Sequence, residues 1–235
     1  MNIDLYKKRM SGAAGDVGRM AFLLRDALWY GWRKPYETKA LVNQFEEIGL
    51  RSILIVVISS FFVGMVLAVQ VAYSEANFAG RVMIGIGVGV SITKEFGPLL
   101  TALLVGGRVS AGITSVIGSM QVTEQVDAIR LMGARPAKKL VFPRVVATVI
   151  MLPLLTVVAD FMGIVGGLVV SVFDVKMSFT TYYYQIVRSV TLSDFFGGML
   201  KAAVFGLFIS IISCYNGLRV KGGAEGVGQA TTRSV

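Results

Sequence analysis

The chain has 235 residues, of which 54% are hydrophobic and only 16% are charged, and its formal net charge is +9. Soluble domains are typically about 25% charged, so this composition argues against a soluble protein. The sequence has no histidine and one cysteine, which excludes almost every metal site built from nitrogen or sulfur ligands and any internal disulfide. We expect that cysteine, Cys214, to be a small buried residue because it lies in an apolar run.

The N-terminal region predicts helices at the membrane surface. Apolar residues recur at helical spacing over 17–34, while interspersed charges argue against a span. The alternative is a helix packed on the rest of the protein. Pro35 should end this helix, and a second polar helix should lead into the membrane. Three aromatic residues suit the level of the lipid headgroups: Trp29, Tyr30 and Trp32.

Four apolar runs follow, at about 52–73, 82–107, 145–173 and 195–216. Each reaches the roughly 20 residues that a helix needs to cross a bilayer core of about 30 Å. The fold class is therefore predicted to be all-α, a polytopic membrane protein with an amphipathic N-terminal interfacial helix and four visible transmembrane helices. We expect one membrane domain over 1–235, made of a cytoplasmic or interfacial part (1–51), a transmembrane bundle (52–216) and a cytoplasmic segment (217–235).

The positive charges predict the orientation of these spans. Lys and Arg number nine in residues 1–51, five in 119–144 and three after residue 216. Only one lies between the first two runs and two lie between the last two. This alternation is the positive-inside pattern, so the basic segments and the N-terminus should be cytoplasmic. The same distribution indicates that the excess basic residues face anionic lipid headgroups, and it argues against nucleic acid as a partner.

Four ionisable residues fall inside the apolar runs: Lys94, Glu95, Asp160 and Lys201. Such residues are costly in a bilayer and are functional candidates. Glu95 is the strongest, because the following Gly97-Pro98 frees backbone groups that need a polar, protein-lined environment. As chain neighbours, Lys94 and Glu95 should not pair with each other. Asp160 could serve structure alone, and Lys201 could extend its stem towards the headgroups.

Small residues and proline suggest how the spans pack. Gly85 and Gly89 form one G-x-x-x-G pattern, and Gly163 and Gly167 form another. We interpret both as close helix contacts in lipid. Pro98 should kink or break the second span.

The stretch 122–144, "VTEQVDAIRLMGARPAKKLVFPR", interrupts the apolar pattern. It predicts a helix over about 124–132, with Thr123 as N-cap and Gly133 as the C-terminal stop. So short a helix is unstable alone and must pack on something. It could lie on its own bundle, or it could dock a separate ATPase subunit. The chain has no phosphate-binding G-x-x-x-x-G-K-[ST] motif, so any ATP would be bound by a partner, and no cofactor is expected in this chain.

Three long motifs carry a family resemblance: "KEFGPLLTALLVGGRVSAG", "GSMQVTEQVDAIRLMGARPAKKLVFPRVVA" and "GGAEGVGQATTRSV". From about residue 20 to its end, the chain resembles the MlaE/YrbE permeases, the non-catalytic membrane subunits of phospholipid ABC transporters. The resemblance implies a bacterial inner-membrane homodimer that maintains outer-membrane lipid asymmetry and holds a phospholipid between its two copies. It also implies a cytoplasmic ATPase subunit, a periplasmic MCE-domain protein and a STAS-domain cytoplasmic subunit as partners.

Two sets of site residues follow. The resemblance makes the 122–144 helix the ATPase-coupling element, and it puts Glu95 near the lipid pocket. The expected coupling residues are Glu124, Gln125, Asp127, Arg130, Met132 and Gly133. Spans one and two should be neighbours because their connection is short, so we expect one substrate-binding cavity lined by Leu67, Phe78, Glu95 and Phe96, with apolar residues beside acyl chains.

The sequence departs from the family pattern at two points. Val116 stands in "SVIG" where the family usually has an acid, and a further span usually follows "ATTRSV". We expect that fifth span to be missing from this chain by truncation. Two other functions stay open: an ion-coupled secondary transporter with Glu95 and Asp160 as a proton relay, and a non-transporting membrane scaffold.

Overall fold

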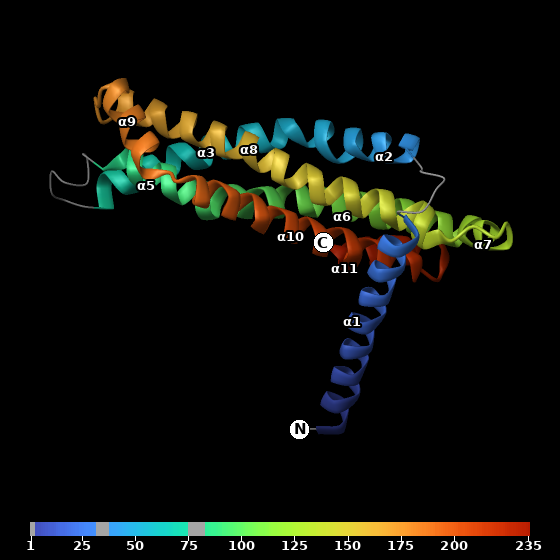
Figure 1. The fold of residues 1–235 in the computed structure, drawn as a ribbon. Helices are drawn as coiled ribbons and strands as arrows, with labels where there is room; N and C mark the ends of the chain where they lie inside the picture. The colour runs from blue at the N-terminus through green and yellow to red at the C-terminus, as the bar shows by residue number, and fades with distance from the viewer. Residues whose placement is uncertain (1–2, 32–37, 75–82) are drawn as a thin grey trace. The chain divides into compact units, whose positions relative to one another are not determined.

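The structure, a computed structural model, describes residues 3–31, 38–74 and 83–235, and every regular element in these ranges is a helix (Figure 1). Four helical stretches are long and apolar enough to cross a membrane: Thr38–Tyr73, Ile84–Val122, Ala137–Phe173 and Leu192–Leu218. The prediction of an all-α polytopic membrane protein is confirmed. Each stretch is longer than the apolar run that predicted it, because polar flanking residues continue the helices.

The N-terminal helices differ in their bounds from those expected. α1 spans Ile3–Gly31, so it begins well before residue 17. Trp32 and Pro35 lie outside the described residues. α2 (Thr38–Phe45) continues through a wider helical turn, η1 (Glu46–Leu50), into α3 (Arg51–Ser74).

The second span stays helical through its proline, but its hydrogen-bond pattern changes just before that residue. α5 (Ile84–Ser91) passes through the π-helical turn η2 (Ile92–Phe96) into α6 (Gly97–Val122), which contains Pro98. Proline has no N–H and its ring clashes with the carbonyl four residues before it, and a π-turn relieves both problems by adding one residue to the turn. Of the two outcomes expected at Pro98, the break is wrong, because the helix continues from Ile84 to Val122.

The same device recurs at the third span. After α7 (Gln125–Leu131), the π-turn η3 (Ala137–Val141) leads into α8 (Phe142–Phe173), and Pro143 is the second residue of that helix. The remaining helices are α9 (Phe179–Ser189), α10 (Leu192–Leu218) and α11 (Gly223–Ser234).

The contacts divide the chain into two compact units. The first unit comprises 1–44, 108–147 and 207–235, and the second comprises 45–107 and 148–206. In the second unit, Ile84, Val88 and Tyr182 belong to a buried cluster that joins α3, α5 and α9. In the first unit, a smaller cluster joins α7 to its neighbours, and Cys214 is fully buried as expected.

Glycines set how closely the helices of the second unit approach. A Cβ on Gly64 of α3 would collide with the backbone of Gly163 on α8, and one on Gly166 would collide with the carbonyl of Phe61. On α5, a Cβ at Gly85 would meet Tyr182 and Gln185 of α9. Close helix contacts at the small-residue patterns are thus confirmed.

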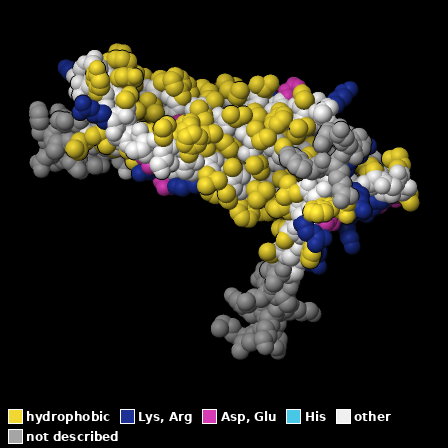
Figure 2. All heavy atoms as spheres, viewed as in Figure 1, with side chains coloured by type: hydrophobic (Ala, Val, Ile, Leu, Met, Phe, Trp, Pro, Cys, Tyr) yellow, Lys and Arg dark blue, Asp and Glu magenta, His cyan; other side chains and the backbone are white. Residues whose placement is uncertain are grey.

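Apolar side chains stay exposed along the spanning helices (Figure 2). On α3, Leu54 is 70% exposed and Val66 is 62% exposed, and on α10 Leu200 is 67% exposed. In water such a surface would associate non-specifically, whereas in hydrocarbon it costs nothing. This exposure therefore fits helices that face lipid.

Gly64→Ala and Gly166→Ala should each destabilise the second unit by about 1–3 kcal/mol, because the added methyl group would overlap backbone atoms that cannot move away. Thermal unfolding of the detergent-solubilised protein measures this. Gly197→Ala on α10 is the matched control, since a Cβ there meets nothing within 4 Å; it should be neutral or stabilising. Equal effects at all three positions would contradict the tight crossing of α3 and α8.

Candidate functional site

The π-turn η2 gathers charged side chains in the middle of an apolar span. In an α-helix the N–H of residue 98 would bond to the carbonyl of Lys94, but Pro98 has no N–H to donate. The ammonium of Lys201, on α10, donates to that carbonyl oxygen at 2.9 Å. It also donates to Oε1 of Glu95 at 2.7 Å. One lysine therefore satisfies a backbone group freed by proline and neutralises the adjacent carboxylate.

A second ion pair lies beside the first. Nζ of Lys94 is 3.1 Å from Oδ1 of Asp194 on α10. Asp194 is itself held by reciprocal hydrogen bonds: its N–H donates to the Thr191 hydroxyl, and its Oδ2 accepts from the Thr191 N–H, both at 3.2 Å. This arrangement is a capping box at the start of α10. We call Lys94, Glu95, Asp194 and Lys201 the charge cluster.

The charge cluster is open on one side. The side chain of Glu95 is 68% exposed, that of Lys201 45% and that of Lys94 46%, whereas Asp194 is only 15% exposed. Charges within a bilayer are costly unless they are paired or covered. The cluster therefore pairs its own charges and still presents a carboxylate and two ammonium groups to whatever lies against this face.

Asp160 is not part of the charge cluster. It is only 6% exposed, and it packs against Gly97, where a Cβ would collide with its Oδ1. Within the described residues, that oxygen has no hydrogen-bond partner. One helical turn away, the Thr101 and Thr156 hydroxyl oxygens are 3.0 Å apart and join α6 to α8. Asp160 thus lies on the inner side of the turn that presents Glu95 outward.

The structure brings only some of the expected cavity residues together. Glu95 and Phe96 are adjacent on η2, with Phe96 half-buried. Leu67 packs into the cluster around Ile84 and Val88, which leaves only part of its surface for a ligand. Phe78 lies outside the described residues.

The expected coupling helix exists as α7, but its N-terminus is built differently. Glu124 occupies the N-cap position with a left-handed backbone (φ 58°) and no side-chain cap. The Thr123 hydroxyl instead donates to the Ser119 carbonyl at 2.9 Å. The prediction of Thr123 as N-cap is therefore wrong, because a threonine that finishes the preceding helix can bond back four residues within it.

The C-terminus of α7 is as expected. Gly133 adopts a positive φ of 73°, its N–H donates to the Arg130 carbonyl, and the Ala134 N–H donates to the Ile129 carbonyl. These two bonds form a Schellman motif, which requires a residue such as glycine that tolerates the left-handed region.

The two faces of α7 have different roles. Val126 and Ile129 are buried against the protein's own chain. At its end, Leu131 is 89% exposed and Met132 is 71% exposed. The expected polar residues Glu124, Gln125 and Arg130 are exposed, and Arg130 pairs with Asp127 at 2.7 Å. The helix therefore packs on its bundle and still presents an apolar tip.

Sequence reasoning missed Asp194, the partner of Lys94. Its signal was present: Thr191 and Asp194 are three residues apart directly before an apolar run, a spacing that predicts a capping box. No pattern indicated that this carboxylate would also face a lysine from another helix.

Known proteins resemble this chain in sequence. The family described as Permease MlaE matches residues 41–235. This chain belongs to the MlaE permease family. Among its relatives, a probable ABC transporter permease protein of Rickettsia felis is 39% identical over 228 residues, which cover 97% of this chain and 88% of that protein.

Two other relatives support the same assignment. The intermembrane phospholipid transport system permease protein MlaE of Haemophilus influenzae is 34% identical over 93% of this chain and 84% of its own length. A probable ABC transporter permease protein of Synechocystis is 39% identical over 83% of this chain and 74% of its own length. The MlaE match contains η2, α7 and α11.

Glu95→Gln and Lys201→Met should each lower the stability of the solubilised protein, and the double variant should lose less than the sum. We expect a coupling energy of about 0.5–1 kcal/mol, because both side chains are partly exposed and screened. Thermal unfolding followed by tryptophan fluorescence measures it. Lys201→Arg should retain most of the stability, and strictly additive losses would show that the two residues do not interact.

Proposed function

We propose that this chain is the permease subunit of an ABC transporter that moves phospholipids between the inner and outer membranes of a bacterium, which helps to maintain outer-membrane lipid asymmetry. Membership of the MlaE family supports this proposal. So do the relatives, one of which is named as an intermembrane phospholipid transport permease and others as ABC transporter permeases. The chain itself would carry out no chemistry.

The observation that carries the proposal is the open charge cluster within an apolar span. A phospholipid headgroup has a phosphate anion and often an ammonium group. Lys94 and Lys201 offer cations to the phosphate, and the 68%-exposed carboxylate of Glu95 offers an acceptor to an amine. Phe96 and the exposed part of Leu67 would lie beside acyl chains, as polar groups in lipid sites are few and flanked by apolar walls.

A second copy of the chain would complete this site. The cluster faces outward from a single chain, and a charged face in hydrocarbon needs a cover. A homodimer would enclose one phospholipid between two such faces.

The apolar tip of α7 supports an ATPase partner. Leu131 and Met132 are two large apolar side chains that are mostly exposed. Exposed apolar surface rimmed by charged residues is typical of interaction sites. We propose that this tip enters a groove of a cytoplasmic ATPase subunit, which binds the ATP. The basic residues that flank α7 support a cytoplasmic position for it.

The remaining parts of the assembly rest on the family resemblance and, for the orientation, on the distribution of Lys and Arg along the sequence. We propose an inner-membrane location with a cytoplasmic N-terminus, a periplasmic MCE-domain protein as a partner and a STAS-domain protein on the cytoplasmic side.

Glu95→Gln should leave expression and assembly normal and slow phospholipid transfer by about tenfold, the effect of losing one charge-assisted hydrogen bond. The measurement is transfer of labelled phospholipid from vesicles containing the reconstituted transporter to acceptor vesicles. Glu225→Gln on α11 removes the same charge away from the cluster and should transfer normally. Wild-type transfer and lipid crosslinking by Glu95→Gln would make the carboxylate structural.

Purification tests the partner and the transport class together. The wild-type chain should bring an ATPase subunit and bound phospholipid with it from membranes. Leu131→Ser with Met132→Ser should release the ATPase and keep the lipid. Phe179→Ser with Val187→Ser removes two similarly exposed apolar side chains from α9 and should retain the ATPase. Gradient-driven transport without any ATPase would instead favour the secondary transporter.

A further inference from the structure

A pocket distinct from the charge cluster lies in the first unit, where α10 ends. Its volume is about 510 Å³, and it is lined from three directions by α1, by the turn after α10 and by one face of α11. Three cationic side chains and one carboxylate line it: Arg219, Lys221, Arg233 and Asp16.

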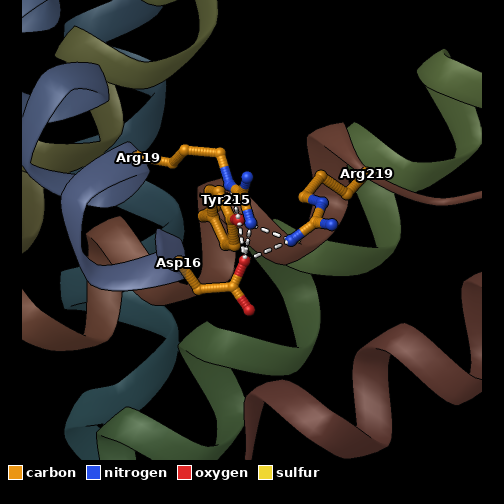
Figure 3. A network of polar contacts seen from close by, with 4 residues as sticks. All are labelled: Asp16, Arg19, Tyr215 and Arg219. Atoms are coloured by element: carbon orange, nitrogen blue, oxygen red, sulfur yellow. Dashed lines mark hydrogen bonds and ion pairs between the residues drawn. The ribbon is translucent and has the colours of Figure 1, made fainter. Parts of the chain in front are cut away.

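One oxygen of this carboxylate gathers the side chains around it (Figure 3). Oδ1 of Asp16 accepts hydrogen bonds from Arg19 at 2.6 Å, from the Tyr215 hydroxyl at 2.6 Å and from Arg219 at 2.7 Å. The Arg19 guanidinium, followed by the Tyr215 hydroxyl, lowers the pKa of Asp16 to about 2. Asp16 therefore stays ionised at any physiological pH, and its bonds clasp α1 to the end of α10.

Two other cations of the same pocket take no part in holding Asp16. Within the described parts of the chain, Lys221 and Arg233 form no ion pair. Arg233 lies on the lining face of α11 together with Gly226 and Ala230, at the three- and four-residue spacing that puts side chains on one side of a helix. Gly226 packs against the backbone carbonyl of Lys221, and Ala230 adds only a methyl group to the lining. The pocket thus has a surplus of positive charge and room for an anion.

Its depth identifies the class of anion. The spanning stretch that contains α10 ends at Leu218, and the pocket is lined by residues just before and after that point. A spanning helix leaves the hydrocarbon near its end, so we infer that the pocket lies at the level of the lipid headgroups, where a cation attracts anionic lipid by about 1 kcal/mol. α1 also carries exposed apolar residues there, among them Val17 at 66% and Phe22 at 61%, which suit contact with acyl chains.

We propose that this pocket binds the phosphate of an anionic phospholipid headgroup from the surrounding leaflet, held by Lys221 and Arg233. The lipid is a resident ligand that fixes α11 against α1 and α10, and it is separate from the lipid proposed as transport cargo. The proposal does not depend on the transport function.

The test measures binding of phosphatidylglycerol to the delipidated permease, purified with its co-purifying subunits, by native mass spectrometry. Phosphatidylglycerol should bind at least about tenfold more tightly than phosphatidylcholine. Lys221→Ala with Arg233→Ala should weaken phosphatidylglycerol binding by about tenfold or more and remove one bound lipid per chain. Lys39→Ala with Lys139→Ala removes two other exposed cations on the basic side of the chain and should change binding by less than about twofold.

Two further variants separate folding from binding. Lys221→Arg with Arg233→Lys keeps both charges and should bind within about threefold of wild type. Ala230→Phe fills the pocket without changing charge and should weaken binding as much as the alanine pair does.

Three results would overturn the proposal. Equal losses in the pocket pair and in the Lys39 and Lys139 pair would show only general electrostatic attraction. Unchanged binding in both the pocket pair and Ala230→Phe would show that no lipid binds in this pocket. Displacement of phosphatidylglycerol by inorganic phosphate at equal concentration would show a site for a soluble anion instead of a lipid.

Discussion

A missing backbone donor inside a membrane span organises the second unit. Pro98 cannot satisfy the carbonyl four residues before it, and hydrocarbon offers no water to do so. The chain answers with the π-turn η2 and with Lys201, whose ammonium group donates to the Lys94 carbonyl at 2.9 Å. A lysine brought into the membrane needs a counter-ion, which Glu95 supplies. Lys94, in the same turn, pairs with Asp194, so the charge cluster surrounds the site of the missing donor.

Close helix packing makes this arrangement rigid. Glycines let α3 and α8 touch along their backbones and let α5 rest on α9. Behind η2, the Thr101 and Thr156 hydroxyl oxygens are 3.0 Å apart, and Asp160 packs against Gly97. The inner face of the turn is therefore fixed by small residues and hydroxyl groups, while its outer face presents charge. A site that is already fixed on its inner side loses little conformational entropy when it binds a ligand.

In the first unit, buried side chains and hydrogen bonds hold the short helix α7 and the N-terminal helix α1 in place. α7 buries Val126 and Ile129 on its own chain, which supports a helix too short to stand alone, and a Schellman motif at Gly133 ends it so that Leu131 and Met132 face outward. Asp16 joins α1 to the end of α10 through three hydrogen bonds. Aromatic contact adds to this, since Arg135 stacks on the Tyr30 ring at 3.6 Å. Surface helices are thereby tied to the ends of spans.

The sequence by itself determined the fold class, the number of visible spans, the intramembrane charges and the existence of α7, because length, hydropathy and glycine stops act locally along the chain. Its three long motifs also pointed to the family. Only the tertiary structure decided which charges pair: Asp194 and Lys201 lie about a hundred residues from their partners, and no local pattern reports such a contact. It likewise decided that Thr123 bonds back into α6, that Leu67 is partly buried and that Asp16 meets Tyr215. Those outcomes depend on how closely helices that are distant in sequence approach each other. Side-chain volume and backbone contacts fix that approach only when the helices have packed.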